Sequence, residues 1–468
     1  MQHFRYIFFL GIGGIGMSAL ARWFRARGYA VSGYDRTETP LTQALQAEGI
    51  GVHYADTVEN IPAEIKNNKA ETLVVLTPAM PTDSAEWGWL REQGYDVRKR
   101  SQVLGLLTGG RPIIAVAGTH GKTTTSSMVA HLLHHAGLDV GAFLGGIAVN
   151  FDSNLVLSKT DSAPVVVEAD EYDRSFLTLH PDVAIVTSTD ADHLDIYGEQ
   201  SALVEAFGEF VSQLKPGGTL LLHHSADPRA AAAAPAGTRV VRYGLNHAET
   251  AALSTEDLRA NNIVVAGHEF RFDLVGGPGG AVPDLRLAVP GFHNVENMLA
   301  AAAVAQVFGV RNEQIRAAVA SYRGVRRRFE FIVTGADKIY VDDYAHHPRE
   351  IEAFLRSLRA LYPDKKLRVI FQPHLFSRTR DFAAGFSQSL SLADEVVLLP
   401  IYPAREQPLP GIISEMLLPA ITSSLKSLQT KAQVLENTRN NPTFDVLATV
   451  GAGDIDTLVP QLREILSK

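Results

Sequence analysis

The chain has 468 residues, of which 46% are hydrophobic and 20% charged, and it carries a formal net charge of −8. This size and composition predict a globular protein of roughly two to four domains. The negative charge argues against general binding to nucleic acid or to an anionic membrane. The absence of cysteine excludes disulfides, thiolate metal sites and cysteine nucleophiles, and it agrees with a cytoplasmic location.

The first predicted unit contains a buried strand at 6–10, a glycine turn at 11–16, a helix at 17–27 and a strand at 31–34. The apolar run at 6–10 loosely resembles a signal peptide, but the glycines that follow interrupt the apolar helix that such a peptide needs. No run reaches the roughly 18 apolar residues of a membrane span. We therefore expect a chain without membrane insertion.

The glycine turn of this unit, GIGGIG, fits the dinucleotide-binding pattern G-x-G-x-x-G. Alone, the pattern predicts NAD. Glycines at a helix N-terminus admit any diphosphate, however, and UDP carries the same group. An acidic residue follows near the spacing expected for a ribose contact. The candidate UDP-sugar residues here are Gly11, Gly13, Gly14, Ile15, Gly16 and Asp35.

The second unit begins with a strand at 113–117 and a helix from about 122, joined by the loop GTHGKT. Main-chain N–H groups and Lys122 can hold phosphates there, and the Thr123 hydroxyl can bind Mg²⁺. The usual pattern has glycine at position 116, where this chain has valine. The alternative is a glycine turn with a surface lysine. A lysine at a helix start is expected to contribute little to packing.

Carboxylates follow the next two predicted strands, at 164–168 and 183–188. Glu168 ends the first of them and Glu171 lies close behind it, whereas the sequence DADHLD (190–195) follows the second. Carboxylates at the carboxyl ends of strands beside a phosphate loop are placed to hold Mg²⁺. His193 is either a metal ligand or a surface histidine.

The third unit follows GVRRRFE (324–330), with strands at 338–342, 367–371 and 395–399 and a helix from Pro348. The alternation of strands and helices predicts an α/β protein with parallel sheets. We expect three domains, at 1–108, 109–325 and 326–468. The segment 225–285 fits poorly and predicts loops or a small antiparallel excursion.

Eight motifs in order give the chain a full-length resemblance to the Mur ligases of peptidoglycan synthesis. They are GTHGKTTT, EADEYDRSF, DADHLD, GFHNVEN, GVRRRFE, DDYAHHP, FQPHLFSRTRDF and GAGDID. The resemblance implies a Rossmann-like UDP-sugar domain, a P-loop ATPase-like central domain and a Rossmann-like C-terminal domain. It is strongest for the branch that joins L-alanine to the lactyl carboxylate of UDP-N-acetylmuramate, with ATP, Mg²⁺ and an acyl-phosphate intermediate.

The resemblance also implies roles for individual residues. The ATP residues are Gly118, Thr119, His120, Gly121, Lys122, Thr123, Thr124, Asn294, Asn297, Arg328 and Asp343, and His120 also contacts the UDP-sugar. The magnesium ligands are Thr123, Glu168, His193 and, more weakly, Glu171. The amino-acid residues are Tyr344, His346, His374 and Arg378, and the last three are catalytic candidates together with Lys122 and His193. Without the family, the asparagines would be helix caps and the triple arginine a solvated face.

Two details bear on the branch. Some relatives have arginine where this chain has Leu375, so Arg378 is expected to carry more of the acceptor's charge. Several later Mur ligases use a carbamylated lysine, but no lysine lies between Lys159 and Lys215, which agrees with the alanine-adding branch.

Three alternatives stay open. They are a recycling ligase that attaches the tripeptide L-alanyl-γ-D-glutamyl-diaminopimelate, an NAD-dependent oxidoreductase, and a non-catalytic UDP-sugar sensor. The sequence also leaves open whether the protein is a monomer or a homodimer.

Overall fold

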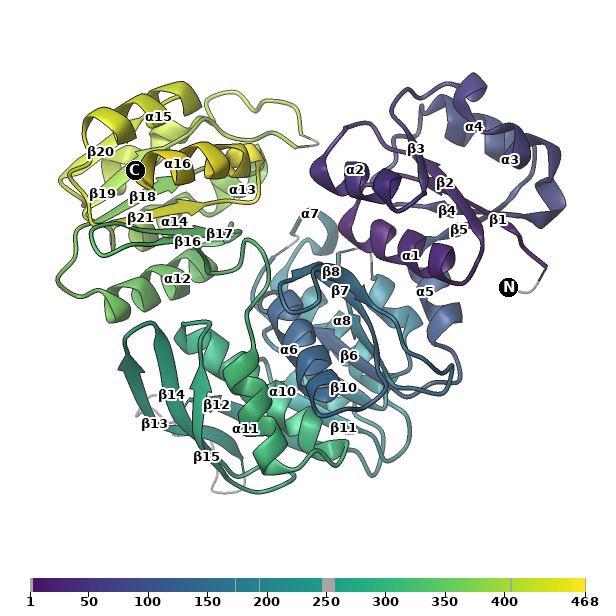
Figure 1. Cartoon of the computed structure of the whole chain (residues 1–468), viewed down its shortest axis with the longest axis horizontal. Coiled ribbons are helices and arrows are strands. Elements are labelled where there is room, and N and C mark those ends of the chain that lie inside the picture. Colours follow the sequence, from purple (N-terminus) through teal and green to yellow (C-terminus); the bar gives the residue numbers. More distant parts are fainter. Residues whose placement is uncertain (1–2, 173, 193, 246–256, 405, 468) are drawn as a thin grey trace. The chain divides into compact units, whose positions relative to one another are not determined.

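The computed structural model describes residues 3–172, 174–192, 194–245, 257–404 and 406–467. It contains three sheets, of five, ten and six strands, and Figure 1 shows helices flanking each of them. The predicted three-part α/β fold is therefore confirmed. The first sheet and the middle sheet through Arg259 belong to one compact unit, and the third sheet belongs to another.

The first sheet is parallel, with the strand order β3-β2-β1-β4-β5. Its strands are β1 (Tyr6–Leu10), β2 (Ala30–Tyr34), β3 (Gly51–His53), β4 (Thr72–Leu76) and β5 (Asp96–Lys99). Its helices are α1 (Ile15–Ala26), α2 (Pro40–Ala47), α3 (Ala63–Asn67), α4 (Ala85–Glu92) and α5 (Arg100–Thr108). The strand order reverses between β1 and β4, and ligands of open α/β sheets bind outside the carboxyl ends of the strands at such a point.

The middle sheet has the order β15-β14-β13-β12-β11-β10-β6-β9-β7-β8. Its strands are β6 (Ile113–Ala117), β7 (Gly141–Ala148), β8 (Ser153–Val156), β9 (Val165–Glu168), β10 (Val183–Val186), β11 (Thr219–His223), β12 (Arg239–Leu245), β13 (Leu258–Ala266), β14 (Glu269–Val275) and β15 (Val282–Leu287). Its helices are α6 (Lys122–His135), α7 (Leu194–Tyr197), α8 (Gln200–Ser212), α9 (Arg229–Ala232), α10 (Phe292–Val307) and α11 (Asn312–Ser321). Strand β6 is fully buried and pairs in parallel with β9 and β10.

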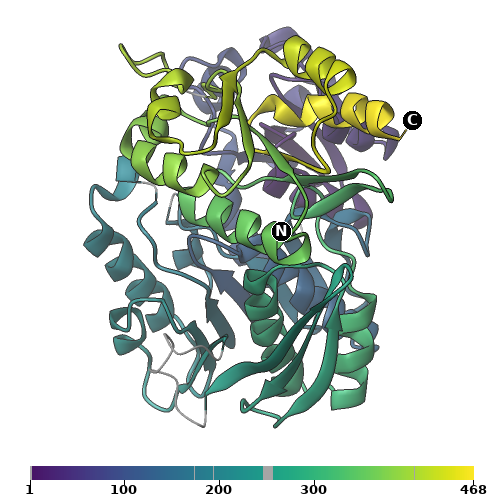
Figure 2. The ribbon, with the colours of Figure 1, turned by 90° about the vertical axis from the view of Figure 1, so that its left-hand side faces the viewer.

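The segment 225–285, which gave no clear α/β pattern, adds four strands to the edge of this sheet. A two-residue turn joins β13 to β14, so the two run antiparallel. Figure 2 shows them as long neighbouring strands. The sequence predicted either loops or a small antiparallel excursion in this segment, and this hairpin confirms the antiparallel excursion. Alternate residues of β14 are buried, which is typical of a sheet with one covered face.

The third sheet has the order β16-β17-β21-β18-β19-β20 and is parallel except for its edge strand β16. Its strands are β16 (Glu330–Thr334), β17 (Ile339–Asp343), β18 (Leu367–Phe371), β19 (Glu395–Leu398), β20 (Leu425–Leu428) and β21 (Val446–Val450). Its helices are α12 (Pro348–Leu361), α13 (Phe376–Asp381), α14 (Ala383–Leu390), α15 (Lys431–Asn440) and α16 (Val459–Leu466). Asp343 and Phe371 both pair with Val450, so β17 and β18 end level on either side of β21.

The predicted strands agree closely with the structure, apart from small shifts at their ends. Strand β10 stops at Val186 rather than 188, because Thr187 and Ser188 bond to the phosphate loop instead. Helix α1 starts at Ile15, inside the predicted turn. The described helices include none that combines the length and the apolar character needed to cross a membrane.

Candidate active site

The loop between β6 and α6 can form only with glycine at two positions. Gly118 has φ +130° and Gly121 has φ +79°, values that favour glycine. A Cβ atom at Gly118 would overlap the Thr187 hydroxyl, and one at Gly121 would lie 2.9 Å from Oδ1 of Asn297. The loop therefore brings its backbone close to its neighbours and directs the free N–H groups of α6 outward, as phosphate binding requires.

The segment that follows β10 supports this loop. The hydroxyls of Thr119 and Ser188 lie 2.7 Å apart, and Ser188 Oγ also accepts the His120 N–H at 2.9 Å. The Thr187 hydroxyl donates to the carbonyls of Ala117 and His120. Thr123 and Thr124 lie buried in the first turn of α6. The predicted ATP residues 118–124 thus form one braced structure.

The Lys122 side chain is only 14% exposed, so it does not stand in solvent at the helix start. Its Nζ donates to both carboxylate oxygens of Glu171 at 2.8 Å and to the Gly118 carbonyl at 2.7 Å. The Glu171 side chain is 0% exposed. The surface-lysine alternative and the expectation of little packing are therefore wrong, because a partner 49 residues away covers the side chain.

The charges of this pair are strongly coupled. Burial opposes the charge on Lys122, but the carboxylates of Glu171 and Asp170 outweigh it and raise the pKa of Lys122. Burial raises the pKa of Glu171 to about 7, against the opposing effect of Lys122. A buried ammonium with a fixed partner is a preorganised cation for phosphate oxygens.

The predicted magnesium ligands lie near the same loop. Glu168 ends β9 and pairs in register with Val116 of β6, two residues before Gly118. Its Oε2 accepts the Gly145 N–H at 3.0 Å, and a Cβ at Gly145 would overlap the carboxylate. Carboxylate and hydroxyl oxygens suit Mg²⁺, so this donor set fits the ion. His193 lies outside the described residues.

Asn294 and Asn297 both lie inside α10, which begins at Phe292. The helix-cap alternative is therefore wrong, since a cap precedes the first helical residue. Asn294 Nδ2 donates to the Pro290 carbonyl at 2.7 Å. Asn297 borders Gly121, so its amide lies beside the phosphate loop.

The third sheet brings together the predicted amino-acid residues at the carboxyl ends of β17 and β18. His346 Nδ1 lies 3.0 Å from the Tyr344 carbonyl, and the rings of His346 and His374 are 6.0 Å apart. The His374 ring also stacks on Tyr402 at 5.8 Å. Arg378, on the short helix α13, is buried. These residues can form a small polar site for an amino acid.

The arginine triplet is a solvated face only in part, because Arg326 is exposed whereas Arg327 and Arg328 are half-buried. Arg327, with φ +60°, bonds to Asp342 Oδ2 at 3.1 Å and to the Gly451 carbonyl at 2.7 Å. The Arg328 guanidinium lies 4.9 Å from the centre of the Tyr344 ring. The solvated-face alternative is wrong for Arg327, which is a structural residue.

Asp343, predicted to contact the ribose, holds the backbone around it. Its Oδ2 accepts the Phe329 N–H and its Oδ1 the Ala345 N–H, both at 2.7 Å. Burial raises the pKa of Asp343 to about 6, and Arg328 opposes that rise. Leu375, the departure noted in the sequence, is buried and brings no charge to this site.

In the first sheet the glycine turn follows β1 at the switch point. Gly11 has φ +86°, and the Gly13 N–H donates to Asp35 Oδ2 at 2.7 Å. Asp35 Oδ1 accepts the Thr37 N–H at 3.2 Å. Asp35 thus fixes the turn, a role that the sequence did not indicate.

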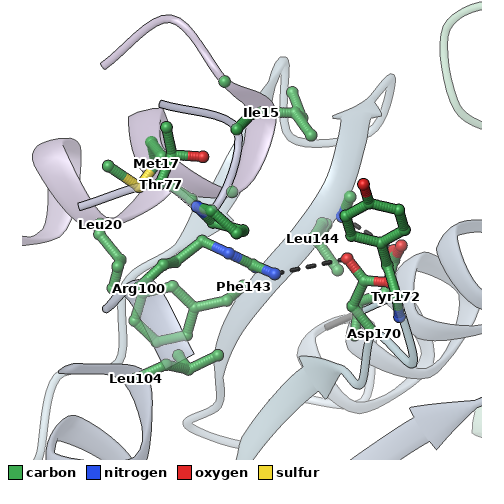
Figure 3. A pocket seen from close by; sticks show the side chains of 17 residues that line it. Ile15, Met17, Leu20, Thr77, Arg100, Leu104, Phe143, Leu144, Asp170 and Tyr172 are labelled. Atoms are coloured by element: carbon green, nitrogen blue, oxygen red, sulfur yellow. Dashed lines mark hydrogen bonds and ion pairs between the residues drawn. The ribbon is translucent and has the colours of Figure 1, made fainter. Parts of the chain in front are cut away.

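A cavity of about 280 Å³ connects this turn with Glu168. Figure 3 shows the side chains around it, which come from α1, α5 and the loop after β4 in the first domain and from β7, β9 and the segment after β9 in the middle domain. Residues missed by the sequence analysis line it, including Thr77, Arg100, Phe143 and Tyr172. Arg100 directly follows β5. Its position at the carboxyl end of a strand could have identified it as a candidate site residue from the sequence.

The comparisons cover nearly the whole chain. Family models match in order: "Mur ligase family, catalytic domain" at residues 6–111, "Mur ligase middle domain" at 116–305 and "Mur ligase, glutamate ligase domain" at 327–455. A relative from Phocaeicola vulgatus named UDP-N-acetylmuramate–L-alanine ligase is 45% identical, over 99% of this chain and 98% of its own. One of the same name from Flavobacterium johnsoniae is 44% identical over 99% and 98%.

Two solved structures also resemble the chain over their full length. The UDP-N-acetylmuramate–alanine ligase of Thermotoga maritima has a TM-score of 0.79 at 28% identity, covering 99% of this chain and 98% of that one. A murein peptide ligase from Psychrobacter arcticus has a TM-score of 0.71 at 25% identity, covering 99% of both chains.

Proposed function

The chain belongs to the Mur ligase family, and we propose that it is an ATP-dependent ligase joining L-alanine to the lactyl carboxylate of UDP-N-acetylmuramate in peptidoglycan synthesis. The observation that carries the proposal is the phosphate loop, whose Lys122 is held by the buried Glu171, in a chain similar at full length to relatives of that name. We further propose a cytoplasmic enzyme, monomeric or homodimeric, with small-molecule substrates.

The reaction needs two steps, because a carboxylate does not condense with an amine in water. A lactyl carboxylate oxygen first attacks the γ-phosphorus of ATP, and the bond to the bridging oxygen breaks to release ADP. The neutral amine of L-alanine then attacks the acyl carbon, and the tetrahedral intermediate expels phosphate while the nitrogen loses a proton. Both steps depend on positioning anions and neutralising their charge.

The residues divide this work as follows. Lys122 and the N–H groups of α6 bind the phosphates of ATP, and Asn297 lies beside them for the nucleotide. Arg378 binds the acceptor carboxylate, while His346 or His374 orients the amine or takes its proton. Thr123 and Glu168 would hold Mg²⁺, which supplies charge neutralisation when bound.

The alternatives differ in what they leave unexplained. An oxidoreductase or a sugar-nucleotide sensor has no use for the phosphate loop and conflicts with the family. The recycling ligase remains the competitor, since a murein peptide ligase shares the fold. The name shared by the 44–45% identical relatives favours L-alanine.

The deciding assay supplies ATP, Mg²⁺ and UDP-N-acetylmuramate with one acceptor at a time and measures ADP release. We expect turnover with L-alanine and weak turnover with glycine or L-serine, since losing one methyl group or adding one hydroxyl changes kcat/KM by only about 10- to 200-fold. Turnover with L-alanyl-γ-D-glutamyl-diaminopimelate alone would assign the chain to the recycling reaction. If none of the acceptors in the panel supports ADP release, the L-alanine reaction and the recycling reaction are both contradicted.

Replacing Gly14 with valine is expected to weaken binding of UDP-N-acetylmuramate about 10- to 100-fold, because overfilling a site costs about 1–3 kcal/mol. Gly14 lines the cavity, and the nearest atom to a Cβ there is 3.5 Å away, so a Cβ at this position makes only ordinary contacts with the turn. Gly13→Val is a poorer probe, because its Cβ would lie 2.8 Å from the Asp35 carboxylate.

Calorimetry with UDP-N-acetylmuramate and with ATP checks this prediction. ATP binding should stay within about threefold of wild type. Gly88→Ala is the matched control, since nothing lies within 4 Å of a Cβ at that position in the same domain. If Gly14→Val and wild type bind UDP-N-acetylmuramate with equal affinity, the glycine turn is not part of the sugar-nucleotide site.

A further inference from the structure

Arg100 places a guanidinium in the wall of the cavity between the first two sheets. It begins α5, directly after β5, and its side chain is 19% exposed. A Cβ atom built on Gly16 would lie 2.7 Å from Nη1 of Arg100, so the guanidinium packs directly on the first turn of α1. Figure 3 shows it reaching across the cavity toward Asp170.

The ion pair with Asp170 is loose. Arg100 Nη2 lies 3.4 Å from Asp170 Oδ2, longer than the roughly 2.7–2.9 Å of a well-formed charged hydrogen bond. The Asp170 side chain is 38% exposed, and its Oδ1 separately accepts the Tyr172 N–H at 3.1 Å. Partly exposed pairs contribute only about 0–1 kcal/mol, so another anion can displace Asp170 from Arg100. Across the described ranges, no other carboxylate pairs with Arg100.

The rest of the surroundings favour an anion at this place. Helix α1 has 12 residues and no acidic residue in its first turn, so its N-terminal N–H groups present a positive pole. The side chains around the Arg100 stem are apolar, namely Met17, Leu104 and Phe143. Two positive groups thus border one cavity, of which one is a planar donor suited to phosphate oxygens.

We propose that Arg100 binds the diphosphate of the UDP-sugar and exchanges Asp170 for it when the nucleotide enters. This inference rests on the proposed function. The contact with Gly16 selects the diphosphate over the lactyl carboxylate, because that turn is where a diphosphate meets the helix N-terminus. A cavity of about 280 Å³ holds only part of the sugar nucleotide, which agrees with a site for the diphosphate that joins the uridine to the sugar.

The first experiment measures binding of uridine, UDP, UDP-N-acetylglucosamine and UDP-N-acetylmuramate by calorimetry, in EDTA at low salt. Arg100→Met should weaken all three diphosphates alike by about 10- to 100-fold, and uridine little, since a charged hydrogen bond contributes about 1.5–3 kcal/mol. Arg100→Lys should recover part of the loss. Arg98→Met is the matched control, because Arg98 pairs with Asp96 at 2.8 Å and does not line the cavity.

Each outcome decides the proposal. A loss confined to UDP-N-acetylmuramate would show that Arg100 reads the lactyl carboxylate, and would overturn it. Equal losses for uridine and UDP would show a structural residue. If wild type binds no uridine nucleotide at all, the proposed function fails; if it binds them and Arg100→Met binds them equally well, only this inference fails.

A second experiment tests the exchange itself. Asp170→Asn should tighten UDP binding severalfold in EDTA, because the competing carboxylate is gone while Oδ1 still accepts the Tyr172 N–H. Gly16→Ala should weaken it, since the new methyl group displaces the guanidinium, but should add little when Arg100 is already methionine. Unchanged or weaker binding in Asp170→Asn, or fully additive losses in the double variant, would contradict the exchange.

Discussion

Lys122→Ala is expected to lower the rate of ligation at least about 100- to 1,000-fold, the loss typical of removing one preorganised group from a transition state. The ammonium is held at 2.8 Å by both oxygens of Glu171, so it is fixed before ATP arrives and needs no reorganisation. Steady-state ADP release measures the effect. Activity within about tenfold of wild type would remove this loop from the chemistry.

The same substitution should also destabilise the protein, because it leaves a buried carboxylate without its partner. Breaking a buried ion pair from one side costs about 3–5 kcal/mol. The control is Lys122→Ala combined with Glu171→Gln, which removes the stranded charge. The double variant should regain much of the stability and none of the activity, so folding and catalysis are separated.

The stability loss should depend on pH. Burial raises the pKa of Glu171 to about 7 even beside Lys122, and removal of the ammonium raises it further. A carboxyl whose pKa is higher in the folded state stabilises the fold at low pH, and that stability is lost as pH rises through the folded pKa. Lys122→Ala should therefore be less destabilised at pH 5 than at pH 8. Denaturation of wild type and of Lys122→Ala at each pH measures this difference. A stability loss that is larger at pH 5 than at pH 8 would contradict the prediction.

Much of the fold could be predicted because its signals are local. The apolar runs of β1, β6 and β18 and the glycine turns behind the first two are readable within a few residues, and the structure places the strands at the expected bounds. Gly11, Gly118 and Gly121 indeed have the positive φ values that such turns need. The segment 225–285 was harder, because alternating strands at a sheet edge carry no glycine-loop signature.

The chemistry was less readable where it depends on partners distant in sequence. Glu171 pairs with Lys122 although 49 residues separate them in the sequence, and Asp170 pairs with Arg100 across 70 residues. Nothing in the local pattern of either cation indicates these carboxylates, since β9 and β6 become neighbours only when the sheet forms. The sequence therefore predicted the two ligand-binding loops better than the ion pairs that Lys122 and Arg100 form with distant carboxylates.

The acceptor site offers the second large effect, at Arg378. Arg378→Ala should raise the KM for L-alanine about 100-fold, because losing a buried cation that pairs with a carboxylate costs about 2–5 kcal/mol. Arg378 is 8% exposed on α13, the helix that follows β18, so water replaces it poorly. UDP-N-acetylmuramate affinity should stay near wild type, since its predicted site lies in the first domain.

A neighbouring arginine supplies the control for this prediction. Arg380 lies on the same helix, but its side chain is 53% exposed and pairs with Asp381 at 2.7 Å. Arg380→Ala should leave the KM for L-alanine within about twofold, because exposed ion pairs contribute about 0–1 kcal/mol. Arg378→Lys should fall between alanine and wild type, since a point charge replaces a two-point donor. If Arg378→Ala lowers only kcat and leaves KM unchanged, the residue acts in the transition state rather than as the anchor of the acceptor carboxylate.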